Sequence, residues 1–398
     1  MKGIDENTIK DFLDVKTKRE LAKILGVEYK TLIYNLYKLK FDEKYNLFEI
    51  KKRNGKTRKI IAPISGIKFI QENLSKILLE IHNAKFCVHG FLKSKSIKTN
   101  ALPHVKKRIL INLDLENFFP TINFGRIRGI FLSKPFEFPE PIATMLAQIC
   151  CYEDYLPQGA PSSPIISNYV CRRLDNQLLK FAKKYKLDYT RYADDITFST
   201  NLKSIPEGVG LVKDNNLKIS EELNEIVVSN GFTINSEKIR YAFRNNRQEV
   251  TGLIVNSFTN VNRKYVRHVR AMLHAWEKFG VDAAAKEHFE KYNYKNKPLQ
   301  NIELSFQAEL VGKIGFIGHI RGKDNKIYKR LYERIKTLNP EVNLSIVEKA
   351  SSESEIPIVY GEGKTDWKHL KAALTYFKRK GEYADLNIAF EKDRKSVV

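Results

Sequence analysis

Two adjacent carboxylates, Asp194 and Asp195, lie within a run of aromatic and β-branched residues from Thr190 to Phe198. This pattern predicts a β-hairpin that carries the acids at its tip. Neighbouring carboxylates repel each other unless a cation neutralises them, and their hard oxygen atoms suit Mg²⁺ better than zinc. The pair therefore indicates metal-dependent chemistry. The alternative is a solvated Asp-Asp turn, since Asp is favoured in turns.

A third carboxylate, Asp114, follows the apolar run that begins at Ile109, which predicts a buried strand with an acid near its end. A two-metal site needs carboxylates from separate strands around ions about 3.5 to 4 Å apart. We predict that Asp114, Asp194 and Asp195 are catalytic and bind two Mg²⁺ ions. Taken alone, Asp114 would be read as a turn former.

The order of motifs along the chain resembles that of reverse transcriptases. An Asp with an aromatic residue five positions later is followed by the Leu-Pro-Gln-Gly run at 156–159 and by the Tyr-Ala-Asp-Asp run at 192–195. A segment from Gly231 to Lys238 completes the order. Each motif is weak alone, but their joint occurrence is a strong signal.

Two further elements are similar to those of retron reverse transcriptases. An Asn-Ala-x-x-His element runs from Asn100 to His104, and a Val-Thr-Gly element comprises Val250, Thr251 and Gly252. The similarity covers roughly residues 20 to 340. It implies that Asn100, His104 and the Val-Thr-Gly residues recognise the retron RNA. The alternatives are an ordinary buried histidine and an ordinary strand kink.

The resemblance implies a function and a set of partners. The enzyme would be an RNA-directed DNA polymerase that copies part of a cognate noncoding RNA (msr-msd) into single-stranded DNA (msDNA). Synthesis would start from an internal guanosine 2′-hydroxyl, use dNTPs, rely on a host ribonuclease H and serve antiphage defence. The alternatives are a ribonucleoprotein scaffold that holds msDNA to control a TOPRIM-type toxic effector, or a group II intron-like or abortive-infection reverse transcriptase.

The same resemblance assigns residues to the substrates. The incoming nucleotide would contact Arg58, Phe119, Gln158, Gly159 and Lys238, and Tyr192 would face the primer terminus. A guanidinium fork suits phosphate oxygens, and an aromatic ring at Phe119 would clash with a ribose 2′-hydroxyl. A core phenylalanine and a solvated lysine are the alternatives for Phe119 and Lys238.

Composition agrees with a nucleic-acid partner. The 398 residues include 69 Lys and Arg against 46 Asp and Glu, giving a formal net charge of +23, which suits a polyanion. No apolar run reaches the roughly 18 residues of a membrane span, and the polar start is not a signal peptide. We therefore expect a cytoplasmic protein without a membrane partner. The four cysteines lack the spacing of a cysteine zinc site. The oligomeric state is left open, with a homo-oligomer among the alternatives.

We predict an α+β fold of the right-hand polymerase type, with fingers, an antiparallel-sheet palm and a helical thumb. The expected parts are an N-terminal helical extension at 1–40 with a capping box at Thr17, fingers at 41–110 with a hairpin at 47–63, a palm at 111–261 and a basic, aromatic-rich thumb at 262–340.

The remaining parts are a linker at 341–357 and a partial α/β segment at 358–398. This segment resembles the first motif of a TOPRIM domain, in which a Glu, here Glu362, follows a strand. A TOPRIM site also needs an Asp-x-Asp pair, and 358–398 contains none. The segment is therefore expected to be truncated or to serve in packing or docking, and not to cut nucleic acid by itself.

Overall fold

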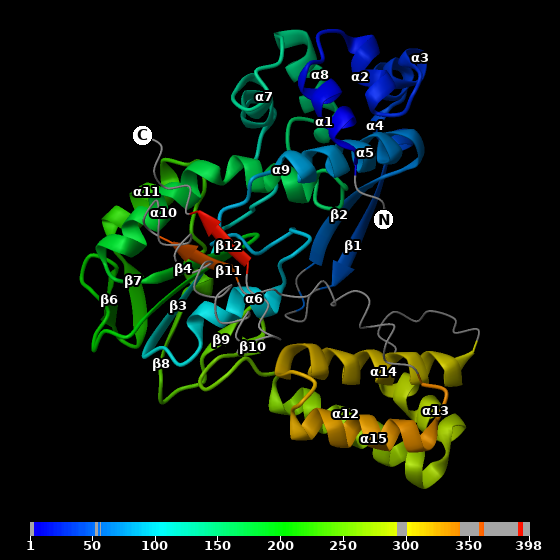
Figure 1. The fold of residues 1–398 in the computed structure, drawn as a ribbon, viewed down its shortest axis with the longest axis vertical. Coiled ribbons are helices and arrows are strands. Elements are labelled where there is room, and N and C mark those ends of the chain that lie inside the picture. Colours follow the sequence, from blue (N-terminus) through cyan, green and yellow to red (C-terminus); the bar gives the residue numbers. More distant parts are fainter. Residues whose placement is uncertain are drawn as a thin grey trace, which may run out of the picture. The chain divides into compact units, whose positions relative to one another are not determined.

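The computed structural model describes residues 4–51, 55, 57–292, 301–342, 358–361 and 389–392. Contacts divide the chain into two units, Met1–Arg263 and Lys264–Val398 (Figure 1).

The first unit begins with short helices packed on a long one. They are α1 (Glu6–Leu13), α2 (Lys18–Ile24), α3 (Tyr29–Ile33), the π-helix η1 (Tyr34–Lys38), α4 (Phe41–Lys44) and the long α5 (Ser65–Ile81). The predicted capping box is present, with the Glu20 amide donating to Thr17 Oγ1 at 3.2 Å and the Thr17 amide donating to Glu20 Oε2 at 3.1 Å. Apolar residues such as Phe12, Leu21 and Leu32 are fully buried, so these helices are a packing element of the unit.

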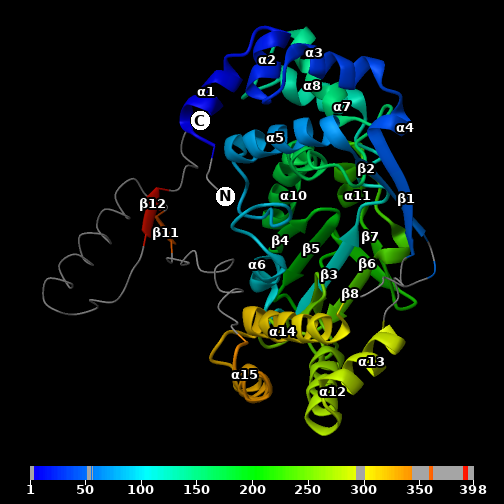
Figure 2. The same ribbon diagram turned by 90° about the vertical axis from the view of Figure 1, so that its right-hand side faces the viewer.

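A two-stranded antiparallel hairpin follows α4. Strands β1 (Tyr45–Lys51) and β2 (Thr57–Pro63) pair from Tyr45 opposite Pro63 to Lys51 opposite Thr57, as the Asn-Gly signal predicts. Four of the five residues of its turn lie outside the described residues. The hairpin is joined to the rest of the unit by the Ile61 amide, which donates to the Gln158 carbonyl at 2.9 Å. Figure 2 shows the hairpin extending from α4 and α5.

A four-stranded sheet forms the centre of the unit. Its strands are β3 (Ile109–Asp114), β4 (Asp188–Tyr192), β5 (Asp195–Thr200) and β8 (Arg240–Phe243), in the order β4-β5-β3-β8 with every neighbouring pair antiparallel. The apolar residues of β3 and β5 are almost completely buried. Helix α10 (Arg172–Lys184) packs on β4. The buried core and helix α10 therefore support the sheet whose strand ends carry the acids.

The first unit contains further short elements around this sheet. They are α6 (Ile97–Ala101), η2 (Leu102–His104), α7 (Phe124–Leu132), α8 (Glu140–Cys150), α9 (Ser163–Val170), β6 (Gly210–Lys213), β7 (Asn216–Ile219), α11 (Glu221–Val228), η3 (Ser236–Lys238), β9 (Glu249–Val250) and β10 (Leu253–Ile254). The four cysteines are buried and free.

The described part of the second unit is mostly helical, as predicted for 262–340. Its helices are α12 (Arg263–Phe279), α13 (Val281–Tyr292), α14 (Ile302–Arg321) and α15 (Lys326–Leu338). Val269, Leu273, Leu310 and Ile314 are fully buried, and Trp276 meets Phe306 edge to face. Among the described residues, no helix is both long and apolar enough to cross a membrane.

Two strands, β11 (Ile358–Gly361) and β12 (Ala389–Lys392), pair in parallel near the end of the chain. Glu362 lies outside the described residues, as do 343–357 of the predicted linker. The TOPRIM-like character of this segment therefore stays a prediction. Helices and antiparallel strands together confirm the predicted α+β class.

Candidate active site

The structure brings the three predicted acids to one end of the central sheet. Asp114, the last residue of β3, lies opposite Asp195, the first residue of β5. Tyr192 on β4 also pairs with Asp195, so Ala193 and Asp194 form a two-residue turn between β4 and β5. Carboxylates from two adjacent strands and one tight turn therefore converge, as the sequence predicted.

The backbone of this turn is held on both sides. Ala193 has φ +56°, a left-handed conformation that is uncommon for a residue with a side chain. Its carbonyl accepts a hydrogen bond from Arg191 Nη1 at 3.1 Å. The Asp194 carbonyl accepts one from the Leu115 amide at 3.1 Å. Protein groups thus fix both sides of the turn.

Arg191 itself is fully buried and is held by Asp175 of α10. Its Nε lies 2.7 Å from Asp175 Oδ1, and its Nη2 lies 2.8 Å from Asp175 Oδ2. Asn168 Oδ1 accepts two further, longer bonds from the same guanidinium. Sequence reasoning assigned no role to Arg191 or Asp175. The signal was an arginine between the two tyrosines of a strand predicted to be buried, because a buried charge requires a partner.

Gly90 is a second residue that sequence reasoning missed. A Cβ atom at this position would lie only 2.6 Å from the Ala193 nitrogen. The Gly90 carbonyl accepts a hydrogen bond from Asn168 Nδ2 at 3.0 Å. The loop that contains Gly90 therefore packs directly against the turn that carries Asp194, and only glycine fits there without a shift.

The surroundings of Asp194 and Asp195 disfavour the ionised forms of both carboxyl groups. Burial raises the pKa of Asp194, with a further contribution from the charge of Asp114. Burial, followed by the charges of Asp194 and Asp114, raises the pKa of Asp195 to about 6. A cluster of carboxylates with raised pKa values favours a cation, and carboxylate oxygens are donors that Mg²⁺ prefers. The donor set therefore fits divalent metal ions.

Lys238 lies beside the acids, at the end of η3. Its Nζ is 2.7 Å from Asp114 Oδ1, and its side chain is 55% exposed. The Asn235 amide, just before η3, donates to the Asp114 carbonyl at 2.8 Å. This segment therefore places a cation at the edge of the acid cluster that solvent and substrate can reach.

The other predicted nucleotide contacts lie on neighbouring elements. Arg58 is exposed on β2, and its charge acts to lower the pKa of Asp194. Gly159 has φ +129° and packs closely on the same strand, where a Cβ would lie 2.9 Å from Ile60 Cγ2. The carbonyl of Gln158 binds β2. The Gln-Gly segment therefore anchors the hairpin that carries Arg58.

Three aromatic rings form a row at the site. Phe91 lies between Phe119 and Tyr192, with ring-centroid distances of 6.4 Å and 6.5 Å. Phe91 has φ +65°, and the sequence carried no signal for its position. The row connects the residue predicted to contact the sugar with the one predicted to face the primer.

Asn100 and His104 are fully buried. The two ring nitrogens of His104 lie 2.7 Å from Ser199 Oγ and 2.8 Å from Thr190 Oγ1, so His104 ties η2 to strands β4 and β5. Asn100 Nδ2 lies 3.4 Å from Thr251 Oγ1. The two retron-type elements thus meet each other inside the protein. Their role in RNA recognition stays a prediction, and for the two buried side chains it would have to act through the surface they support.

Thr251 and Gly252 also border the acid cluster. Both have positive φ, +45° and +83°, and they line a cavity of about 140 Å³ together with Asp195 and Arg240. Val250 is buried. Arg240 acts to lower the pKa of Asp195.

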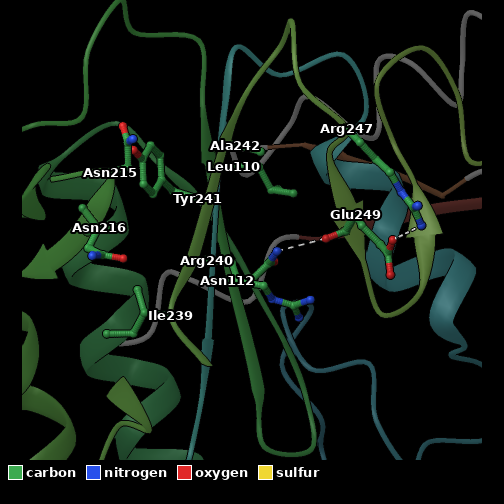
Figure 3. Close-up of a pocket in the computed structure, with 11 residues that line it drawn as sticks. Leu110, Asn112, Asn215, Asn216, Ile239, Arg240, Tyr241, Ala242, Arg247 and Glu249 are labelled. Atoms are coloured by element: carbon green, nitrogen blue, oxygen red, sulfur yellow. Dashed lines mark hydrogen bonds and ion pairs between the residues drawn. The ribbon is translucent and has the colours of Figure 1, made fainter. Parts of the chain in front are cut away.

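A larger cavity of about 460 Å³ lies along β3 and β8 (Figure 3). Asn112 and Arg240 line it from these strands, and Arg247 and Glu249 line it from the β9 side. Asn112 Nδ2 donates to the Glu249 carbonyl at 3.0 Å, and Arg247 pairs with the Glu249 side chain. Because Asn112, Arg240 and Glu249 border both cavities, a polar surface leads from the sheet edge toward Asp195.

Comparison with known proteins agrees with this geometry. The family model for reverse transcriptase (RNA-dependent DNA polymerase) matches residues 50–266. This range contains the four-stranded sheet and the three acids, and it confirms the predicted right-hand polymerase fold.

The chain is also similar to retron enzymes. The retron Mx65 reverse transcriptase of Myxococcus xanthus is 33% identical over 279 residues, which are 65% of this chain and 62% of the relative. The retron Ec86 reverse transcriptase of Escherichia coli is 29% identical over 337 residues, 84% of this chain and 92% of the relative. The chain thus spans less than two thirds of the Mx65 enzyme's length. Among solved structures, telomerase from Candida albicans, solved with a fragment of telomeric RNA, superposes with 10% identity, a TM-score of 0.40 and coverage of 77% of this chain and 66% of that one.

Proposed function

Because the chain belongs to the reverse transcriptase family, we propose that it is the RNA-directed DNA polymerase of a retron. The single observation that carries this proposal is the meeting of Asp114, Asp194 and Asp195 at one end of the sheet. The template would be a cognate structured RNA (msr-msd) copied into msDNA, in accord with the retron relatives.

The three carboxylates would hold two Mg²⁺ ions. Bound there, the ions would activate the attacking hydroxyl and stabilise the departing pyrophosphate. The protein itself would keep the carboxylates in place, because Arg191 and Leu115 donate hydrogen bonds to the backbone carbonyls of the turn. This fixed geometry matters because the three carboxylates repel one another unless cations bind between them.

Lys238 and Arg58 would act on the triphosphate. Lys238 pairs with Asp114, and cations held by the acids would free its ammonium to bind phosphate oxygens. Arg58 extends from the exposed end of β2, where a guanidinium can bind two phosphate oxygens at once. The Phe119, Phe91 and Tyr192 rings would then bound the sugar and the primer terminus.

The finer features rest on the retron relationship. Synthesis would begin at an internal guanosine 2′-hydroxyl and leave a branched RNA-linked DNA, with the template removed by a host ribonuclease H. The product would act in antiphage defence. The +23 formal charge supports a large polyanionic partner of this kind.

The test is expression of the protein with its neighbouring noncoding locus, followed by extraction of short single-stranded DNA. A variant with both Asp194→Asn and Asp195→Asn is the matched control, since these changes keep side-chain shape while removing metal-binding charge. The DNA is then treated with ribonuclease and with debranching enzyme.

A band that only the wild-type protein makes, and that shifts after debranching, is the expected result. An unbranched product that needs no cognate RNA would indicate a group II intron-like or abortive-infection enzyme. Absence of product from a well-expressed, folded wild type would overturn the retron polymerase proposal, in favour of a ribonucleoprotein scaffold or of a non-retron reverse transcriptase with a different template.

A further inference from the structure

Three side chains of metal-binding type meet within the second unit, outside the predicted active site. His268 lies on α12, His288 on α13 and Glu309 on α14. One ligand atom from each lies within 4.8 Å of the other two. The two imidazole centroids are 5.6 Å apart, and His288 Nε2 lies 3.2 Å from Glu309 Oε1.

The surroundings of His288 give a second, independent indication that this cluster binds a ligand. The residue is 6% exposed, and its Nε2 atom has no hydrogen-bond partner within the part of the chain that the structure describes. Glu309 Oε1 is near enough but is not aligned for a hydrogen bond. Buried polar atoms usually have partners, so an unpartnered imidazole nitrogen 3.2 Å from a carboxylate oxygen indicates a ligand between them.

The donor set has the chemistry of an open zinc site. Two imidazole nitrogens and one carboxylate oxygen, with water in the fourth position, are a known zinc arrangement. A cavity of about 160 Å³ bordered by both histidines adjoins the cluster and leaves room for a water molecule.

We propose that His268, His288 and Glu309 bind a late first-row divalent ion such as Zn²⁺. The ion joins α12, α13 and α14 and stabilises their packing, since a ligand that binds only the folded state adds to its stability. The site is separate from the acid cluster and does not depend on the proposed polymerase function.

Lys313 is placed where it would weaken metal binding at this site. Its Nζ lies 3.2 Å from the same Glu309 Oε1, one helical turn away. An ammonium so placed competes with a metal ion for the carboxylate. Replacing it by a neutral side chain is therefore expected to tighten zinc binding, a gain that misfolding cannot produce.

The test measures zinc binding by calorimetry and thermal unfolding, with Co²⁺ absorption as a probe of the ligand sphere. The full chain is used without an affinity tag, in the Asp194→Asn, Asp195→Asn background so that the acid cluster does not add its own metal. Glu309→Gln and His268→Gln should each weaken binding by more than about 10- to 100-fold, the range for losing an outer-shell partner. His274→Gln, an exposed position on α12, is the matched control and should bind zinc as the parent does.

Tighter binding by Lys313→Gln together with weaker binding by Glu309→Gln would establish the site. The proposal is overturned if the parent binds no zinc, or if zinc binding is the same in the parent, Glu309→Gln and His268→Gln. None of these readouts requires polymerase activity, so a failure of the proposed function would leave this result unchanged.

Discussion

Arg191 and Asp175 form a buried, two-pronged ion pair beneath the turn that carries Asp194. Their side chains are 0% and 1% exposed, and the nitrogen–oxygen distances are 2.7 Å and 2.8 Å. Since Arg191 also donates to the Ala193 carbonyl, this ion pair links helix α10 to the backbone of the candidate active site.

Asp175→Asn should destabilise the protein strongly. The change leaves the Arg191 charge buried without its full partner, which typically costs about 3 to 5 kcal/mol. Urea unfolding measures the loss. Glu222→Gln, which breaks the exposed Lys184–Glu222 pair, is the control and should cost only a small fraction of that. If both changes lower the free energy of unfolding equally, the buried pair contributes no more to stability than the exposed pair.

The acids could be predicted from sequence because their signals are local. An apolar strand that ends at Asp114 and a hairpin pattern around Asp194 and Asp195 place carboxylates at strand ends. Antiparallel pairing then brings Asp114 opposite Asp195. The strands of the central sheet and the helices of 262–340 follow from the same kind of periodicity.

The support beneath the acids could not be predicted in this way. The partner of Arg191 comes from a helix whose position depends on the packed core, and Gly90 meets Ala193 across about a hundred residues of sequence. The Asn100 and His104 motif is expected to recognise RNA, and no local signal in it indicates that both side chains are buried. A motif shows which residues matter in a family, but burial depends on tertiary packing.

Gly90→Ala should lower polymerase activity. The added Cβ would fall 2.6 Å from the Ala193 nitrogen and would push the turn that holds Asp194. A displacement of about 1 Å at reacting groups can cost roughly 100-fold in rate. Primer extension on a supplied template measures this. Gly129→Ala, in helix α7, is the control, because its added Cβ meets no atom within 4 Å apart from the backbone of its own helix. Similar activity in both variants would contradict the proposed close contact.

Phe119→Ala should admit ribonucleotides more readily. If the ring contacts the sugar, its loss removes a steric barrier, and steric discrimination of this kind is worth roughly 10- to 200-fold. The ratio of dNTP to rNTP incorporation efficiency is the readout. Phe91→Ala should lower the ratio less, because Phe91 acts through its contacts with the Phe119 and Tyr192 rings. Phe69→Ala, at an exposed position on α5, is the control, and unchanged sugar selectivity in Phe119→Ala would remove Phe119 from this role.

His104 should make the protein sensitive to acid. Burial, with smaller contributions from His89 and Lys107, lowers the pKa of His104 from 6.5 to about 3. The unfolded chain takes up this proton near pH 6.5 while the folded chain does not, so the contribution is complete above pH 6.5 and is lost as the pH falls toward 3. Within that window one histidine changes the free energy of unfolding by about 1.4 kcal/mol per pH unit.

His104→Gln provides the comparison for that acid sensitivity. The variant should be less stable at pH 7.5, because Ser199 and Thr190 lose their shared partner. Its free energy of unfolding is measured in urea between pH 7.5 and 5. Below pH 6.5 it should fall less steeply than that of the wild type, by about the 1.4 kcal/mol per pH unit that one proton contributes. The exposed His274→Gln should keep the wild-type slope. If His104→Gln also keeps it, the imidazole is protonated in the folded protein and does not serve as a neutral bridge between β4 and β5.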